Sequence, residues 1–165
     1  GYQDSEVLYP YYRLQEDDFH VDIAAEKPGD IHGILGTKIK ATKPVTEINV
    51  NDYDLLILPG GVKSLEKVRQ QKIVLDFIHE WNERGKIIGS ICHGAQLLIS
   101  AKVTKGRRIS AYYSIKDDVE NSGAIYVDAP YVSDKNIVSS PHYNHLGSWM
   151  KEVLRIFYFQ HDKEN

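Results

Sequence analysis

Hydrophobic residues follow two different spacings along this chain of 165 residues. Short, almost uninterrupted apolar runs occur at residues 19–25, 53–61 and 87–91, as in strands buried on both faces of a sheet. Elsewhere apolar residues recur on one side of a helical pattern, over residues 5–14, 65–84 and 146–159 and in the segment that follows residue 92. The alternation predicts an α/β fold in which helices cover both faces of a mainly parallel sheet.

The remaining segments predict smaller elements. Turn residues at 27–30 and 33–36 indicate a small hairpin within residues 26–50 rather than another strand–helix unit. A short helix is expected over residues 115–121, and strands are expected at residues 124–127 and 137–139, around a turn at 134–136. Because no repeat or linker interrupts the pattern, residues 1–165 are expected to form one domain.

The start of the chain departs from the usual order of an α/β sheet. The first helix begins within about four residues of residue 1, whereas a typical strand needs about five or six. We therefore expect that an N-terminal strand of the sheet is missing from this sequence. Without it, the sheet must expose or repair one edge.

Composition narrows the class of protein. With 42% hydrophobic residues, the chain can bury a core without a disulfide or a structural metal. Its single cysteine cannot form an internal disulfide, which fits a reducing cytoplasm. The net charge of −3, from 20 basic and 23 acidic residues, makes nucleic acid a poor partner. No apolar run approaches the roughly 18 residues of a membrane span, so a soluble cytoplasmic protein is expected.

The single cysteine lies where a strand meets a helix. Apolar residues 87–91 precede Cys92 and a helical pattern follows it, so the chain must turn sharply there. The small residues Ser90 and Gly94 stand two positions to each side, which is the spacing of a nucleophile elbow with cysteine in place of serine. The helix start would also favour a thiolate and hold a developing oxyanion. The alternative is a buried structural cysteine, which is the commoner case for a free thiol.

The residues around Cys92 resemble a known family. Residues 90–101, with 58–61 before them and 112–118 after them, resemble the PfpI intracellular-protease branch of the ThiJ/PfpI superfamily, and residues 4–13 and 149–152 extend the similarity. The resemblance implies a flavodoxin-like three-layer sandwich related to class I glutamine amidotransferases. It also implies a homodimer or a larger homo-oligomer, and it implies no cofactor.

The resemblance also assigns candidate catalytic residues. Cys92 corresponds to the nucleophile and Glu6 to an acid that hydrogen-bonds it. Such a bond is chemically reasonable, because a protonated carboxyl can donate to sulfur. From the residues alone, Glu6 is more simply a solvated acid in the first turn of a helix. His93 corresponds to a general base or an oriented partner, although a side chain at a helix start can also point elsewhere.

Glu66 is the fourth catalytic candidate. It corresponds to an acid that reaches the histidine of a neighbouring subunit, which would complete a Cys–His–Glu set across an interface. The alternative is an ordinary exposed glutamate near a helix start. The segment around Glu66 is also one residue longer here than in the family pattern.

Four further residues are candidates for substrate binding: Gly60, Gly61, Tyr112 and His142. Gly60 and Gly61 allow close backbone approach, and the amides of Gly61 and His93 would form an oxyanion hole by resemblance, although a simple turn explains two glycines equally. Tyr112 corresponds to a tyrosine that lines the site and can donate a proton, with ordinary packing as the alternative.

The segment after residues 139–140 departs from the family pattern. Many relatives carry an arginine here, whereas this chain has His142 and His145. Two histidines three residues apart can share a metal, but no neighbouring carboxylate or second cysteine completes a set. We therefore predict no metal site and a neutral lining at the pocket mouth, with His142 near the substrate.

Three functions follow from these residues. The first is an enzyme that acts on reactive carbonyl compounds or their amino-group adducts through a Cys92 thiolate, as in glyoxalase or deglycase chemistry. The second is an intracellular cysteine peptidase with the intersubunit Cys–His–Glu set. The third is a stress-response protein without turnover, in which Cys92 oxidises to a sulfinate.

Overall fold

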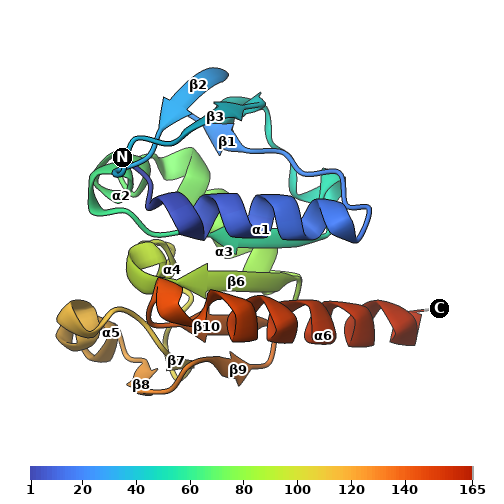
Figure 1. The fold of residues 1–165 in the computed structure, drawn as a ribbon. Coiled ribbons are helices and arrows are strands. Elements are labelled where there is room, and N and C mark those ends of the chain that lie inside the picture. The colour runs from blue at the N-terminus through green and yellow to red at the C-terminus, as the bar shows by residue number, and fades with distance from the viewer. Residues whose placement is uncertain (165) are drawn as a thin grey trace.

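The central sheet contains four strands in the order β5–β6–β10–β9 in the computed structural model, which describes residues 1–164, with side chains through residue 162 (Figure 1). These strands are β5 (Leu55–Leu58), β6 (Ile87–Ile91), β10 (Ile137–Ser140) and β9 (Val132–Asp134). The first three run parallel, and β9 pairs antiparallel with β10. β6 is buried along its whole length because it has a strand on each side and helices on both faces.

Helices cover both faces of the sheet. In the described part of the chain they are α1 (Asp4–Glu16), α2 (Val62–Val68), α3 (Lys72–Glu83), α4 (Ala95–Ser100), α5 (Lys116–Asn121) and α6 (Leu146–Glu164). On the near face in Figure 1, α1 and α6 lie side by side and bury Leu14, Trp149 and Val153 against the sheet. On the other face, α3, α4 and α5 bury Trp81 and Leu98. The predicted α/β fold with three flavodoxin-like layers is confirmed.

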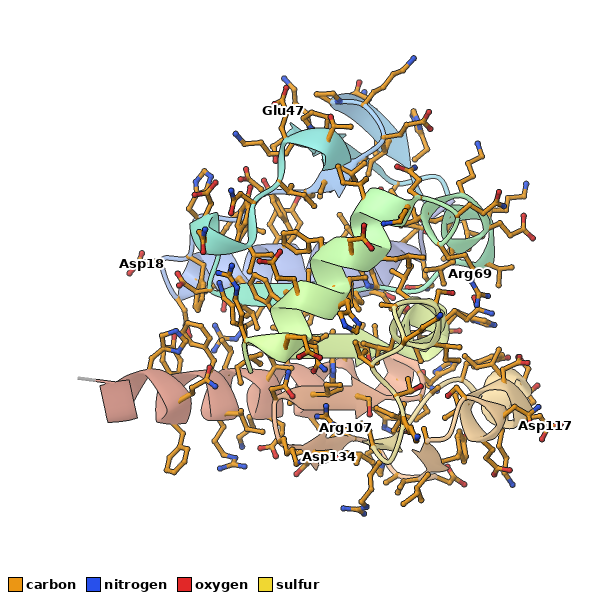
Figure 2. All side chains as sticks on the ribbon, turned by 180° about the vertical axis from the view of Figure 1, so that it is seen from behind. Asp18, Glu47, Arg69, Arg107, Asp117 and Asp134 are labelled. Carbon is orange, nitrogen blue, oxygen red and sulfur yellow. The ribbon has the colours of Figure 1, made fainter. Side chains whose placement is uncertain are left out.

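Short strands form three small sheets beside the central one. They pair β1 (Ala24–Ala25) with β4 (Lys43–Pro44), β2 (Gly29–His32) with β3 (Lys38–Ala41), and β7 (Arg108–Ile109) with β8 (Ile125–Tyr126). The β2–β3 pair is the predicted hairpin. Arg107, next to β7, forms an ion pair with Asp134 of β9, with 3.3 Å between Nε and Oδ2, and Figure 2 shows the two residues together.

The structure corrects two predicted elements and contains short strands that were not predicted. The strand expected over residues 19–25 is limited to Ala24–Ala25, because only these residues pair with another strand. The helix expected over residues 65–84 is two helices, α2 and α3, since Gln71 has an extended backbone between them. The short strands β7 and β9 were not predicted, because each contains too few residues to show an alternating pattern.

An apolar groove runs along the open edge of β5. Among the described residues, β5 pairs only with β6, so its other edge has no strand partner. A cavity of about 880 Å³ lies there, between α1, residues 19–24 and α3. Its lining includes Leu14, Val21, Ile57 and Phe77. The sequence predicts an exposed or repaired edge, and β5 forms that edge; the additional strand stays a prediction.

None of the helices in the described residues combines the length and the apolar character that crossing a membrane requires.

Candidate active site

Cys92 occupies a sharp turn between β6 and α4. Ile91 has an extended backbone, Cys92 has a φ of 58° in the left-handed region, and a single 3-10 turn (Cys92–Gly94) leads into α4. A non-glycine residue in this conformation is uncommon and strained, as at the nucleophile of an elbow. The geometry predicted from Ser90 and Gly94 is therefore present.

The turn also depends on a close approach to β5. A Cβ atom on Gly94 would lie 2.2 Å from the carbonyl oxygen of Leu58. A Cβ atom on Gly60 would lie 2.5 Å from Glu6 Oε1 and 3.3 Å from both the Cβ of Cys92 and the amide nitrogen of His93. The absence of a side chain at Gly60 thus lets these three groups converge.

Glu6 is fully buried in the first turn of α1. Its Oε1 accepts a 2.8 Å hydrogen bond from the Gly60 amide, whereas its Oε2 has no hydrogen-bond partner among the described residues. Glu6 and Cys92 change each other's pKa, so the two groups interact. The alternative of a solvated first-turn acid does not match this burial.

Burial governs the protonation of both groups. It raises the pKa of Glu6 to about 7, although the Gly60 amide and Cys92 pull it in the other direction. Burial, together with the negative charge of Glu6, raises the pKa of the Cys92 thiol to about 12. The thiolate predicted from the helix start is therefore not favoured. The His93 amide lowers the pKa of the thiol, but burial raises it by more, since Cys92 is only 7% exposed. Protonation of Glu6 removes the repulsive charge.

Replacing Glu6 by glutamine is expected to raise the rate at which iodoacetamide alkylates Cys92 at pH 8 by about tenfold, since a pKa lowered by one unit gives ten times more thiolate. Below pH 7 the wild-type carboxyl takes up its proton, so the difference between the two proteins should narrow. Mass spectrometry over pH 5.5–9 measures both rates. Glu16→Gln, which changes an exposed carboxylate on the same helix, is the matched control and should alkylate as the wild type does.

His93 lies within reach of the thiol. Its Nδ1 is 3.4 Å from Cys92 Sγ. The side chain is half-buried, and burial lowers its pKa, so the neutral imidazole that can accept a proton is favoured at neutral pH. This contact favours a role as a proton carrier over a side chain that points away.

Glu66 is not part of this cluster in the single chain. It is exposed on α2, and its backbone carbonyl accepts a hydrogen bond from the side chain of Gln70. A contact with the histidine of another subunit stays a prediction.

The two glycines differ in their roles. The Gly60 amide already donates to Glu6, so it is not a free oxyanion donor. Gly61 has a φ of 116°, which glycine adopts without strain, and a Cβ there would lie 2.6 Å from the carbonyl oxygen of Gly1. The amides of Gly61 and His93 stay the predicted oxyanion hole.

Tyr112 and His142 lie on the same side as the thiol. The Tyr112 amide donates a 3.3 Å hydrogen bond to the Cys92 carbonyl, and its ring centroid is 4.8 Å from that of His93 and 6.1 Å from that of His142. Tyr113 and Tyr143 join these rings, with centroids 4.6 Å from Tyr112 and 3.9 Å from His142. Neither tyrosine was predicted from the sequence, although each is adjacent to a candidate residue.

The described residues contain no cluster of three or more histidine, cysteine, aspartate or glutamate side chains suited to hold a metal ion. His142 uses its Nδ1 to accept a hydrogen bond from the Asn144 amide, which fixes the neutral ring. Cys92, Glu6 and His93 stay the predicted catalytic residues of this site.

Comparisons with known proteins agree with this geometry. The model of the DJ-1/PfpI family matches residues 1–156. The protein named Deglycase PfpI from Pyrococcus furiosus is 39% identical over 155 residues, which cover 94% of this chain and 93% of that protein. Protein/nucleic acid deglycase 2 from Escherichia coli is 32% identical over 158 residues, which cover 94% of this chain and 91% of that protein.

A solved structure shares the fold. It is a two-domain protein from Anabaena variabilis with DJ-1/ThiJ/PfpI-like and ferritin-like domains, 27% identical, with a TM-score of 0.90. The match covers 93% of this chain and 44% of that one.

Proposed function

Because this chain belongs to the DJ-1/PfpI family, we propose that it is a cysteine-dependent deglycase that removes dicarbonyl adducts from amino groups. The observation that carries the proposal is the convergence of Glu6, Gly60 and His93 on Cys92 at the strained turn after β6. A buried acid with a pKa of about 7 and a neutral histidine can move protons on either side of a nucleophile.

The first half of the reaction transfers the adduct to the protein. In an adduct of methylglyoxal, the amine nitrogen is bonded to a carbinol carbon next to a ketone. The sulfur of Cys92 gives its proton to His93 and forms a bond to the carbinol carbon. The carbon–nitrogen bond breaks, and the departing amine takes up a proton from His93 or Glu6. The free amine leaves, and a hemithioacetal remains on Cys92.

The second half releases the carbon fragment. A proton moves from the sulfur-bearing carbon to the adjacent ketone carbon through an enediol, so the first carbon is oxidised to a thioester and the second is reduced to an alcohol. Developing negative charge on oxygen is stabilised by the amides of Gly61 and His93, and Tyr112 can donate a proton there. Water then cleaves the carbon–sulfur bond. Adduct and water give amine and lactate, without an external oxidant or reductant.

The test is a product balance on a preformed methylglyoxal adduct of an N-acetylated amino acid. Lactate and free amine should appear in a 1:1 ratio. Alkylation of the protein with iodoacetamide should stop lactate formation and lower amine release to the spontaneous rate, since Cys92 is its only cysteine. The same adduct without protein gives the rate at which methylglyoxal escapes spontaneously. If lactate never forms faster than methylglyoxal escapes, the protein is a glyoxalase that uses only the free dicarbonyl. If no lactate forms at all, both the deglycase and the glyoxalase reaction are refuted.

Peptide-bond hydrolysis is the second candidate function, because the 3.4 Å contact between Cys92 and His93 is the pair that a cysteine peptidase needs. It also requires an acid to orient His93, which would be Glu66 of another copy in a homo-oligomer. A fluorogenic peptide in the same assay distinguishes this function: cleavage that is lost on alkylation, without lactate, would favour it. The raised pKa of Cys92 gives no support to a redox sensor, which needs an easily ionised thiol.

A further inference from the structure

Five aromatic rings from three separate segments form a continuous surface, here called the aromatic wall. Its members are His93, Tyr112, Tyr113, His142 and Tyr143. Neighbouring ring centroids are 3.9 to 6.1 Å apart. Such contacts hold each ring in a defined orientation, so the wall is a preformed surface.

The wall starts at the nucleophile and ends in solvent. Next to Cys92 are His93, whose Nδ1 is 3.4 Å from the sulfur, and Tyr112, whose amide donates to the Cys92 carbonyl. The outer members are more open: Tyr113 is 72% exposed and Tyr143 is 45% exposed. A group attached to the reacting carbon would therefore leave the thiol along these rings.

Among the described residues, the groups that act on the inner end of the wall include no lysine or arginine. The titratable groups that shift the pKa of Cys92, Tyr112 or His142 are Glu6, Tyr113, Tyr143, His145 and Cys92 itself; none of these described residues is a lysine or an arginine. Burial lowers the pKa of both His93 and His142, so the two imidazoles are uncharged at neutral pH.

Acidic residues follow the outer ring of Tyr113 along the chain. Asp117 and Asp118 lie in the first turn of α5, about one helical turn after Tyr113, and Figure 2 shows Asp117 on this helix. The nearby Lys116 is directed to Glu120, 3.8 Å away, and to the ring of Tyr126. The surroundings therefore suit a cationic group better than a carboxylate or a phosphate.

We propose that this aromatic wall selects adducts carried by arginine side chains, a specificity that rests on the proposed deglycase function. A guanidinium group is planar, always charged and weakly hydrated, so it stacks on aromatic faces. The ammonium group of lysine is compact and strongly hydrated, and it gains less from a flat surface. In an arginine adduct, the reacting carbon is bonded directly to a guanidinium nitrogen, which places the flat cation beside Tyr112 and His142 when that carbon meets the sulfur.

The kinetic test compares preformed methylglyoxal adducts of N-acetylarginine and N-acetyl-lysine. The wild type should show a kcat/KM ratio of at least about tenfold in favour of arginine. The double variant Tyr113→Leu/Tyr143→Leu should narrow the ratio to about twofold, and His142→Arg, which adds a cation to the wall, should remove the preference or invert it. Tyr12→Leu, at a 57% exposed tyrosine on α1, is the matched control and should keep the wild-type ratio.

A binding measurement separates failure of this proposal from failure of the proposed function. In Cys92→Ala, which cannot turn over, N-acetylargininamide should shift the NMR signals of Tyr112 and Tyr143 at concentrations at least about fivefold lower than N-acetyl-lysinamide does. Equal binding of the two amides, or wall variants that change both adducts alike, would overturn the specificity. Preferential arginine binding without lactate from any adduct would leave the wall's selectivity in place and refute the deglycase reaction.

Discussion

Cys92→Ser is expected to lower the rate of lactate formation from a methylglyoxal adduct by on the order of 10³-fold or more. The substitution exchanges sulfur for oxygen at the same backbone position. A serine hydroxyl ionises far less readily than a thiol, and Glu6 and His93 cannot compensate, because burial already opposes negative charge at this position. Initial rates at saturating adduct, with lactate measured enzymatically, give the ratio.

The fold of this variant is checked independently of its activity. Serine fits the space of a cysteine, so the unfolding midpoint should stay within a few degrees of the wild type. A residual rate above about one tenth of the wild-type rate, in protein free of wild-type contamination, would mean that another group performs the attack. His93 would then be the first residue to test, since it is the other nucleophile in contact with the site.

The elbow was predictable from the sequence because its requirements are local. A buried strand, a cysteine and two small residues at fixed spacing describe the turn, and the left-handed φ of Cys92 follows from the reversal of the chain within one residue. The long amphipathic helix was predictable for the same reason, and it was found as α6. Hydrophobic periodicity describes such elements without knowledge of their neighbours.

Long-range features could not be read in this way. The burial of Glu6 depends on α1 lying over the carboxyl end of β5, where the Gly60 amide meets the carboxylate. Only the family resemblance linked Glu6 to Cys92 in the sequence, and no pattern gives the loss of water that raises both pKa values. The break between α2 and α3 was missed because the apolar spacing continues through Gln71.

The aromatic wall also could not be predicted from the sequence, because its residues come from separate segments of the chain. Tyr112 and His142 were candidates by resemblance, but Tyr113 and Tyr143 became part of the site only when three turns of the chain came together. The chain contains eleven tyrosines, and the sequence does not distinguish those at the site from the others. The structure distinguishes Tyr113 and Tyr143 because both are exposed and belong to the ring cluster next to Cys92.

Gly94→Ala is expected to destabilise the folded state by about 3 kcal/mol, at the upper end of what overpacking usually costs. The added Cβ would lie 2.2 Å from the carbonyl oxygen of Leu58 and 3.1 Å from the Pro59 oxygen, and both obstacles are backbone atoms. Leu58 cannot withdraw freely, because β5 is held in register with β6, where Leu58 pairs with Ser90. For a protein of this size the unfolding midpoint should fall by roughly 10 °C.

Gly147→Ala provides the opposite case in the same protein. This glycine lies near the start of α6, and a Cβ there meets no atom within 4 Å, so alanine should stabilise the helix by about 0.5 kcal/mol. Both variants make the same glycine-to-alanine change, so the difference between their unfolding midpoints in calorimetry measures the effect of the position alone.

If Gly94→Ala unfolded within about 2 °C of the wild type, the close contact between the elbow and β5 would not contribute to stability. Loss of activity in that variant would then reflect a shift of Cys92 alone, whereas destabilisation with loss of activity would show that the contact with Leu58 supports both the fold and the position of the nucleophile.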